Sequence, residues 1–199
     1  MLASYAKIPD AEALFAEADV AMAGLQSVLV APATCSMTHS EVERLVDDQG
    51  REILRLLLQG HLDLRGRAEP AEPVVGSDSV ERTHRREGTT RPLFTVVGPV
   101  EVKRTAYGAR GAPSLMPVDA DLNLPAESYS LEVQRRVASL ASRVSFDAVV
   151  EEMAAHTGAP VPKRQAEEEV GRAAQDFDAF YGATELAADP DSTSGLAIL

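Results

Sequence analysis

The chain has 199 residues, of which 45% are hydrophobic, and this is typical of one compact domain or two small ones with a real core. No apolar run approaches the ~20 residues of a membrane-spanning helix, and the N-terminus MLASYAKIPD lacks the order of a signal peptide, so we expect a cytoplasmic protein without membrane segments. The single Cys35 excludes an internal disulfide, and the four histidines form no Cys/His cluster with zinc spacing. We therefore expect no bound metal and no cofactor.

The net charge of -12 argues against a generic nucleic-acid coat protein, but the charge is unevenly distributed. Between Arg82 and Arg110 there are seven Lys or Arg residues and only two Glu. An acidic chain with one basic segment is typical of a protein that binds phosphates locally.

Two amphipathic helices are predicted at the N-terminus. Residues 10–30 place Leu14, Ala18 and Leu25 on one side, and Pro32 ends that helix. A capping box of Thr38 with Glu41, or of Ser40 with Glu43, begins a longer helix that reaches about Leu64, unless Gly60 weakens it or ends it early. A hairpin with so small a core needs a partner, which is either the rest of the chain or a second copy, so a homodimer through these helices is one prediction.

Residues 65–79 contain two prolines and two glycines and are predicted to be a linker. Three strands are expected next, at residues 80–87, 93–97 and 100–107, because β-branched and aromatic residues alternate or cluster there. The turn signals are Gly88-Thr89-Thr90 and Gly98-Pro99, which predict a three-stranded antiparallel meander. Residues 108–125 are predicted to be a loop, in which Asp119 and Asp121 are turn residues and not metal ligands.

The basic side chains of the meander are candidates for contacts with DNA phosphates. They are Arg82, His84, Arg85, Arg86, Arg91, Lys103 and Arg104. A solvated basic face without a ligand is the alternative interpretation.

Three helices are predicted in the C-terminal part. Ser130 begins one whose apolar positions are Val133, Val137, Leu140 and Val144, and Ser145 begins the next. Residues 157–160 form a tight turn in which Gly158 takes the left-handed conformation. The last helix begins at Pro162, and its apolar positions are Ala166, Val170, Ala173, Phe177 and Tyr181. This order is typical of a helix-turn-helix unit.

The N-terminal end of that last helix carries Lys163, Arg164 and Gln165. In a helix-turn-helix this end reaches the base edges, and Arg and Gln are suited to bidentate contacts with guanine and adenine. The alternative is that the two helices simply build a helical core, and the acidic residues at 167–169 would repel phosphates unless they face away from the duplex.

The predicted fold is therefore mainly α-helical with a small β meander. It comprises a helical hairpin (1–64), a linker (65–79), a basic β ribbon with its loop (80–125), a three-helix helix-turn-helix unit (126–182) and a linker or tail (183–199). The final residues LAIL resemble the start of a buried strand.

Six segments, taken in order, resemble the front half of transposases of the ISKra insertion-sequence family. They are HLDLRG (61–66), VERTHRR (80–86), LFTVVGPVEVKRTAYG (93–108), LNLP (122–125), YSLEVQRRVA (129–138), and VPKRQAEE with DFDAFY (161–168 and 176–181). In that family an RNase H-like domain with an Asp/Asp/Glu triad follows, and this sequence ends before the first Asp. Related transposases often hold the ribbon with paired cysteines on zinc, and this chain has none there.

The resemblance implies the DNA-binding and assembly region of a truncated or split transposase, which recognises double-stranded transposon ends and is not itself an enzyme. An acidic helical protein-interaction or regulatory module without DNA binding is the second hypothesis. An independent enzyme has little support, since no nucleophile, base and orienting group occur in a recognisable motif.

Overall fold

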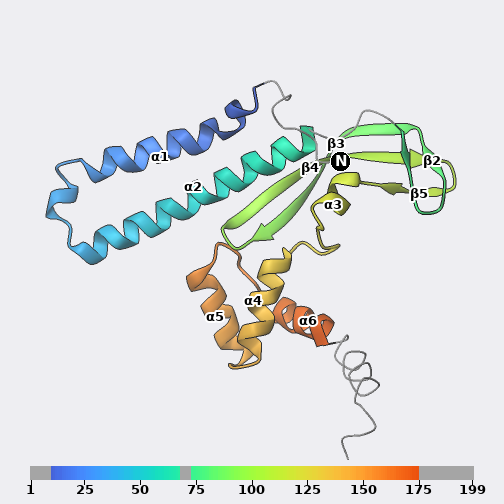
Figure 1. Cartoon of the computed structure of the whole chain (residues 1–199). Helices are drawn as coiled ribbons and strands as arrows, with labels where there is room; N and C mark the ends of the chain where they lie inside the picture. The colour runs from blue at the N-terminus through green and yellow to red at the C-terminus, as the bar shows by residue number, and fades with distance from the viewer. Residues whose placement is uncertain (1–9, 68–72, 175–199) are drawn as a thin grey trace, which may run out of the picture.

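The computed structural model describes residues 10–67 and 73–174, and it is mainly helical with small antiparallel sheets, as predicted. Figure 1 shows three parts: an antiparallel pair of long helices, a twisted ribbon of strands beside the second of these helices, and a group of three short helices at one end of the ribbon. Residues 175–199, which include the predicted apolar positions Phe177 and Tyr181 and the predicted tail, lie outside the described residues.

The N-terminal helical hairpin consists of the 3-10 helix η2 (Glu12–Phe15), α1 (Ala16–Leu29), the 3-10 helix η3 (Thr34–Ser36) and α2 (His39–Arg67). Of the two predicted capping boxes, Thr38 with Glu41 is the one that forms: the Thr38 N–H donates to the Glu41 carboxylate at 2.7 Å, and the Glu41 N–H donates to the Thr38 hydroxyl at 3.3 Å. Helix α2 continues beyond the predicted end near Leu64.

Gly60 does not end α2. A Cβ at this position would lie 2.7 Å from the Leu14 carbonyl oxygen and 2.9 Å from the Phe15 ring. Glycine is therefore required for the close approach of η2 to α2. The sequence alone had left open whether Gly60 weakens the helix or ends it early.

The sheet differs from the predicted meander. The second half of the predicted first strand and most of the predicted second strand belong to one long strand, β3 (His84–Thr95), which pairs with β4 (Gly98–Ala109). The expected turn at Gly88 is instead a bulge: the register shifts between Arg86 and Thr89, and Gly88 has a φ of 70°. A single left-handed glycine satisfies a bulge as well as a turn, so the composition could not separate the two.

Of the remaining strands, two lie in segments that were predicted to be loop and linker, and the third lies within the predicted first strand (80–87). Strand β5 (Ala112–Leu115) is the third strand of this sheet, and β1 (Val74–Val75) pairs with β2 (Glu81–Arg82) in a separate small sheet. The short helix α3 (Pro117–Asp121) follows β5. Its Val118 packs with Leu62 of α2 and with Leu93, Val100 and Val102 of the ribbon, which joins the hairpin to the sheet in one buried cluster.

The three C-terminal helices are α4 (Leu131–Ala141), α5 (Phe146–His156) and α6 (Lys163–Ala174). Ser130 and Ser145 cap α4 and α5 as predicted, since their hydroxyls accept from the N–H groups of Val133 and Ala148. The buried core of this unit is formed by Tyr129, Val133, Val137, Val149, Met153, Ala159, Val161 and Ala166. Val144 was expected in this stripe, but it follows the end of α4 and is exposed.

The connection between α5 and α6 is not a tight turn. Thr157 is extended, with φ -137° and ψ 162°, and Gly158 is not in the left-handed region. The Gly158 N–H donates to the Val96 carbonyl at 3.0 Å, so the connection lies against the end of the β3–β4 hairpin. The predicted helix-turn-helix is therefore two helices with an extended six-residue link, because contact with the sheet, and not local turn chemistry, decides its path.

Candidate nucleic-acid interface

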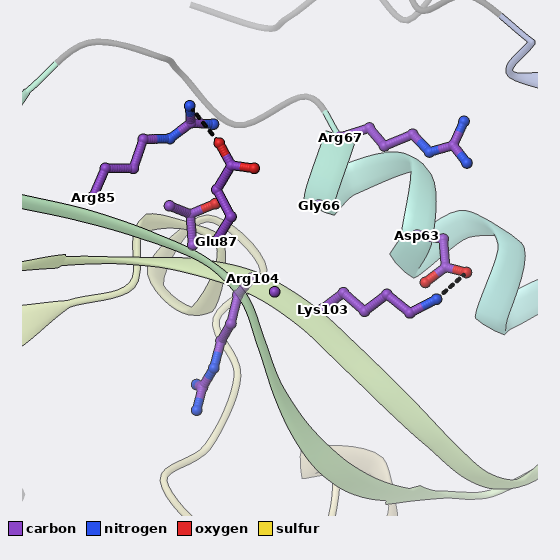
Figure 2. Close-up of a pocket in the computed structure, with 9 residues that line it drawn as sticks. Asp63, Gly66, Arg67, Arg85, Glu87, Lys103 and Arg104 are labelled. Carbon is purple, nitrogen blue, oxygen red and sulfur yellow. Dashed lines mark hydrogen bonds and ion pairs between the residues drawn. The ribbon is translucent and has the colours of Figure 1, made fainter.

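A cleft of about 320 Å³ lies between the C-terminal end of α2 and the β3–β4 ribbon (Figure 2). Its lining residues are Asp63, Gly66, Arg67, Arg85, Glu87, Gly88, Lys103, Arg104 and Thr105. Three of the predicted phosphate-binding residues, Arg85, Lys103 and Arg104, thus line one cleft, although Arg85 lies on β3 and the other two on β4.

Two glycines allow this arrangement. At Gly66 a Cβ would lie 2.6 Å from the Lys103 carbonyl oxygen, so the absence of a side chain lets the end of α2 approach β4. At Gly88 the positive φ permits the bulge, which adds an extra residue to β3 beside the cleft. The cleft depends on these two backbone features as much as on its charged side chains.

The cleft is basic but contains ion pairs. Arg85 Nη1 lies 2.8 Å from Glu87 Oε1, and Lys103 Nζ lies 3.2 Å from Asp63 Oδ2. In the part of the chain that the structure describes, no carboxylate pairs with the exposed Arg67 guanidinium. Arg67 had been assigned to the linker and was missed as a site residue, because only the tertiary structure places it beside the ribbon.

The exposed side chains of His84 and Arg86 belong to the same end of β3. Side chains alternate along a strand, so both point to the face opposite Arg85. Neither takes part in an ion pair within residues 10–67 and 73–174. The basic end of the ribbon is thus solvated on both faces.

Arg82 was predicted to face phosphates, and the structure contradicts this. Only 1% of the residue is exposed. Its guanidinium donates to both Asp78 carboxylate oxygens, at 2.7 and 3.0 Å, to the Val80 carbonyl at 2.8 Å and to the Pro113 carbonyl at 3.0 Å. The charge-assisted hydrogen bonds from Arg82 lower the pKa of Asp78 to about 2. Arg82 therefore joins β2 to β5 and is structural.

Arg91 and Arg104 also do not lie on the predicted phosphate-binding face. Both are largely buried beside α3, where Arg104 pairs with Asp119 and Arg91 lies 3.9 Å from the same carboxylate. Arg91 also donates to the Glu127 carbonyl. Figure 2 shows the Arg104 side chain pointing away from the other cations of the cleft. Asp119, predicted to be a turn residue, is the acceptor that joins the ribbon to α3.

The three predicted base-reading residues lie in the first turn of α6. Lys163 Nζ lies 2.8 Å from Asp147 Oδ1, and this carboxylate raises the pKa of the lysine. Arg164 is 90% exposed at its side chain and pairs with Glu168 at 3.0 Å. The Gln165 amide donates to Glu169 at 3.0 Å. Glu169 is buried and also pairs with Arg172, so one of the three acidic residues does face inward.

A second basic cluster, which sequence reasoning missed, lies between α4 and α5. Its cavity of about 280 Å³ is lined by Arg135, Arg136, Ser139, Leu140, Arg143, Glu152, Met153, His156 and Thr157. Glu132 accepts hydrogen bonds from Arg135 and Arg136, which lower its pKa to about 2. The RR pair in the resemblance segment was a signal that could have identified this cluster.

Among the described residues, no group of three or more His, Cys, Asp or Glu side chains is arranged to hold a metal ion. None of the described helices combines the length and hydropathy that crossing a bilayer requires. In comparisons with known proteins, no family model, no curated protein and no solved structure matches the chain.

Proposed function

We propose that the protein binds double-stranded DNA, and that the cleft between α2 and the ribbon holds the phosphate backbone. One observation carries the proposal: Arg67, Arg85 and Lys103, from three separate elements, line one open cleft in a chain with a net charge of -12. Three cations around one cleft of an otherwise acidic protein favour the binding of a specific anionic ligand over a basic surface that only keeps the protein in solution.

The ion pairs in the cleft are compatible with this role. Arg85 and Glu87 are both exposed, so water screens their pair, and pairs of this kind contribute little to stability. A DNA phosphate can therefore replace Glu87 as the partner of Arg85 at small cost. The Asp63 side chain is only 18% exposed, but it also accepts a hydrogen bond from the Gln59 amide at 3.1 Å, so it keeps one partner when Lys103 binds a phosphate. Arg67, which has no carboxylate partner among residues 10–67 and 73–174, needs no such exchange within that part of the chain.

We further propose that α6 reads base edges through Arg164 and Gln165, while the ribbon positions the duplex. The resemblance to ISKra-family transposases supports transposon ends as the DNA. It assigns this chain the binding and assembly steps and leaves strand cleavage to the Asp/Asp/Glu domain of that family.

The test measures affinity for a labelled duplex between 50 and 200 mM salt. Each of the changes Arg67→Gln, Arg85→Gln and Lys103→Gln removes one phosphate contact and should lower the log-log salt slope by about 0.9 on any sequence. Arg44→Gln is the matched control, because Arg44 is an exposed arginine near the other end of α2 that donates to the Ser40 carbonyl and to no other group in the described part of the chain.

Two results would contradict the proposal: no salt-dependent binding by the wild-type chain in low salt, or an equal effect of Arg44→Gln. The second candidate, a protein-interaction module, would then be preferred. The exposed apolar side chains of the helical hairpin, which include Val20, Leu54 and Leu57, are the observation that favours it.

A further inference from the structure

An apolar groove with a volume of about 700 Å³ lies along the helical hairpin. Met22 and Leu25 of α1 form one wall, and Val46, Leu54 and Leu57 of α2 form its floor. The groove ends at the β3–β4 turn and at Arg136 and His156. Leu54 is 54% exposed, and Met22, Val46 and Leu57 are each at least 40% exposed, so the groove leaves a row of large apolar side chains in water.

Helix α1 has a second unusual surface, on the side away from α2. Its buried residues are Ala18 and Leu25, which face α2. The opposite side carries Ala16, Val20, Ala23 and Ser27, spaced i, i+4, i+7 and i+11. All four are exposed, Val20 at 73%, and none is charged. A surface helix ordinarily carries charged or polar side chains on its solvent face, so this uncharged face indicates a helix that is covered on two sides.

We propose that the groove is the docking site for α1 of a second copy of this chain. Helix α1 forms one wall of the groove of its own copy. A two-fold axis that runs beside this wall therefore places α1 of each copy in the groove of the other copy. The two helical hairpins then form a four-helix bundle with both α1 helices between the two α2 helices. One contact, made twice, covers both the groove and the uncharged face of α1.

Charge is compatible with the same occupant. Helix α1 carries Glu17 and Asp19 and no Lys or Arg, whereas the groove lining contains Arg51 and Arg136 and one carboxylate, Asp47, which pairs with Arg51 at 2.8 Å. The lining therefore has a small excess of positive charge, located at Arg136, which favours an acidic helix over a basic one.

The size of the contact is sufficient for a stable dimer. Fourteen residues give α1 a length of about 21 Å, and two reciprocal helix-in-groove contacts bury on the order of 800 Å² per partner, the area of a standard interface.

The first experiment measures the mass of the wild-type chain by analytical ultracentrifugation at about 100 μM. We expect twice the 21.2 kDa of one chain. Val20→Glu and Leu54→Glu each place a charge in the contact and should raise the dissociation constant at least tenfold, with an unchanged circular dichroism spectrum because both side chains are already exposed. Leu131→Glu is the control: Leu131 is 47% exposed at the first position of α4, where an acidic residue suits the helix N-terminus.

The second experiment tests the geometry in a Cys35→Ser background, which removes the exposed native thiol. A protein with Val20→Cys is mixed with one carrying Leu54→Cys and oxidised gently. A mixed disulfide-linked species is expected, because Val20 of one copy faces Leu54 of the other. A monomeric wild-type chain would overturn the proposal and leave the groove to another protein, and a dimer without the mixed species would overturn this arrangement. Neither readout involves DNA, so both are independent of the proposed DNA binding.

Discussion

Individual glycine residues decide how closely the parts of this molecule approach one another. Gly158 is the clearest case, since a Cβ there would lie 2.6 Å from the Gly98 nitrogen and 2.7 Å from its Cα. Gly98 itself has a φ of 131°, so the two glycines meet where neither a side chain nor an ordinary backbone conformation would fit. The hydrogen bond from Gly158 to Val96 depends on this contact.

Gly158→Ala should therefore destabilise the protein by about 1 to 3 kcal/mol, because the added methyl forces the β3–β4 turn away from the α5–α6 connection. Chemical denaturation followed by circular dichroism measures the free energy of unfolding. Gly171→Ala is the control: nothing lies within 4 Å of its Cβ position in α6, and alanine there should stabilise the helix by about 1 kcal/mol. Equal stability of Gly158→Ala and wild type would show that this contact does not form in solution.

At the scale of elements, the basic side chains in the first turn of α6 are already held by ion pairs. Lys163 and Arg164 are exposed, but each already has a carboxylate partner, one on α5 and one on its own helix. The extended link to α5 also differs from the short turn of a DNA-reading helix-turn-helix. Base reading by α6 consequently requires Arg164 and Gln165 to exchange Glu168 and Glu169 for base edges.

The proposal for α6 predicts a specific pattern in binding data. Arg164→Ala or Gln165→Ala should cost about 1 to 3 kcal/mol on the transposon-end duplex and little on random duplex, since base contacts carry discrimination. Competition titrations with the two duplexes measure this difference. Lys103→Gln should weaken binding to both duplexes equally and serves as the comparison. If the α6 changes also act equally on both, α6 is a packing helix and does not read sequence.

At the scale of the whole molecule, residues 94 and 128–130 connect the ribbon to the helical unit. The Phe94 N–H donates to the Ser128 carbonyl at 2.7 Å, and the Ser130 N–H donates to the Phe94 carbonyl at 2.9 Å. The Phe94 and Tyr129 rings stack with centroids 5.2 Å apart, and the Tyr129 hydroxyl donates to the Pro160 carbonyl at 3.2 Å. Tyr129 thus contacts the sheet and the α5–α6 connection, and it lies directly before α4.

Tyr129→Ala should lower the free energy of unfolding by about 3 to 5 kcal/mol, because it leaves a cavity in the buried cluster between the ribbon and the helices. Tyr129→Phe keeps the ring and removes only the hydrogen bond to Pro160, so its cost should be about 1 kcal/mol. Urea titrations of both variants measure the two costs. Similar stabilities for the Ala and Phe variants would mean that the stacked ring does not hold the two parts together.

The sequence by itself determined the features that depend on neighbours along the chain. The helices of the hairpin and of the C-terminal unit have the predicted type, and the caps at Thr38, Ser130 and Ser145 form where the pattern indicated. Apolar periodicity and side-chain capping involve residues three or four positions apart, so a single sequence contains all the required information.

Only the tertiary structure decided what depends on residues far apart in the chain. Gly88 could form a turn or a bulge, and long-range pairing of β3 with β4 selected the bulge. From the sequence, Arg82 was a candidate phosphate ligand, but the fold brings the Pro113 carbonyl, 31 positions away, to its guanidinium. Arg67 was assigned to the linker, but it ends α2 and lines the same cleft as Lys103. A basic side chain has the same chemistry when buried or exposed, so its role is set by the partners that the fold provides.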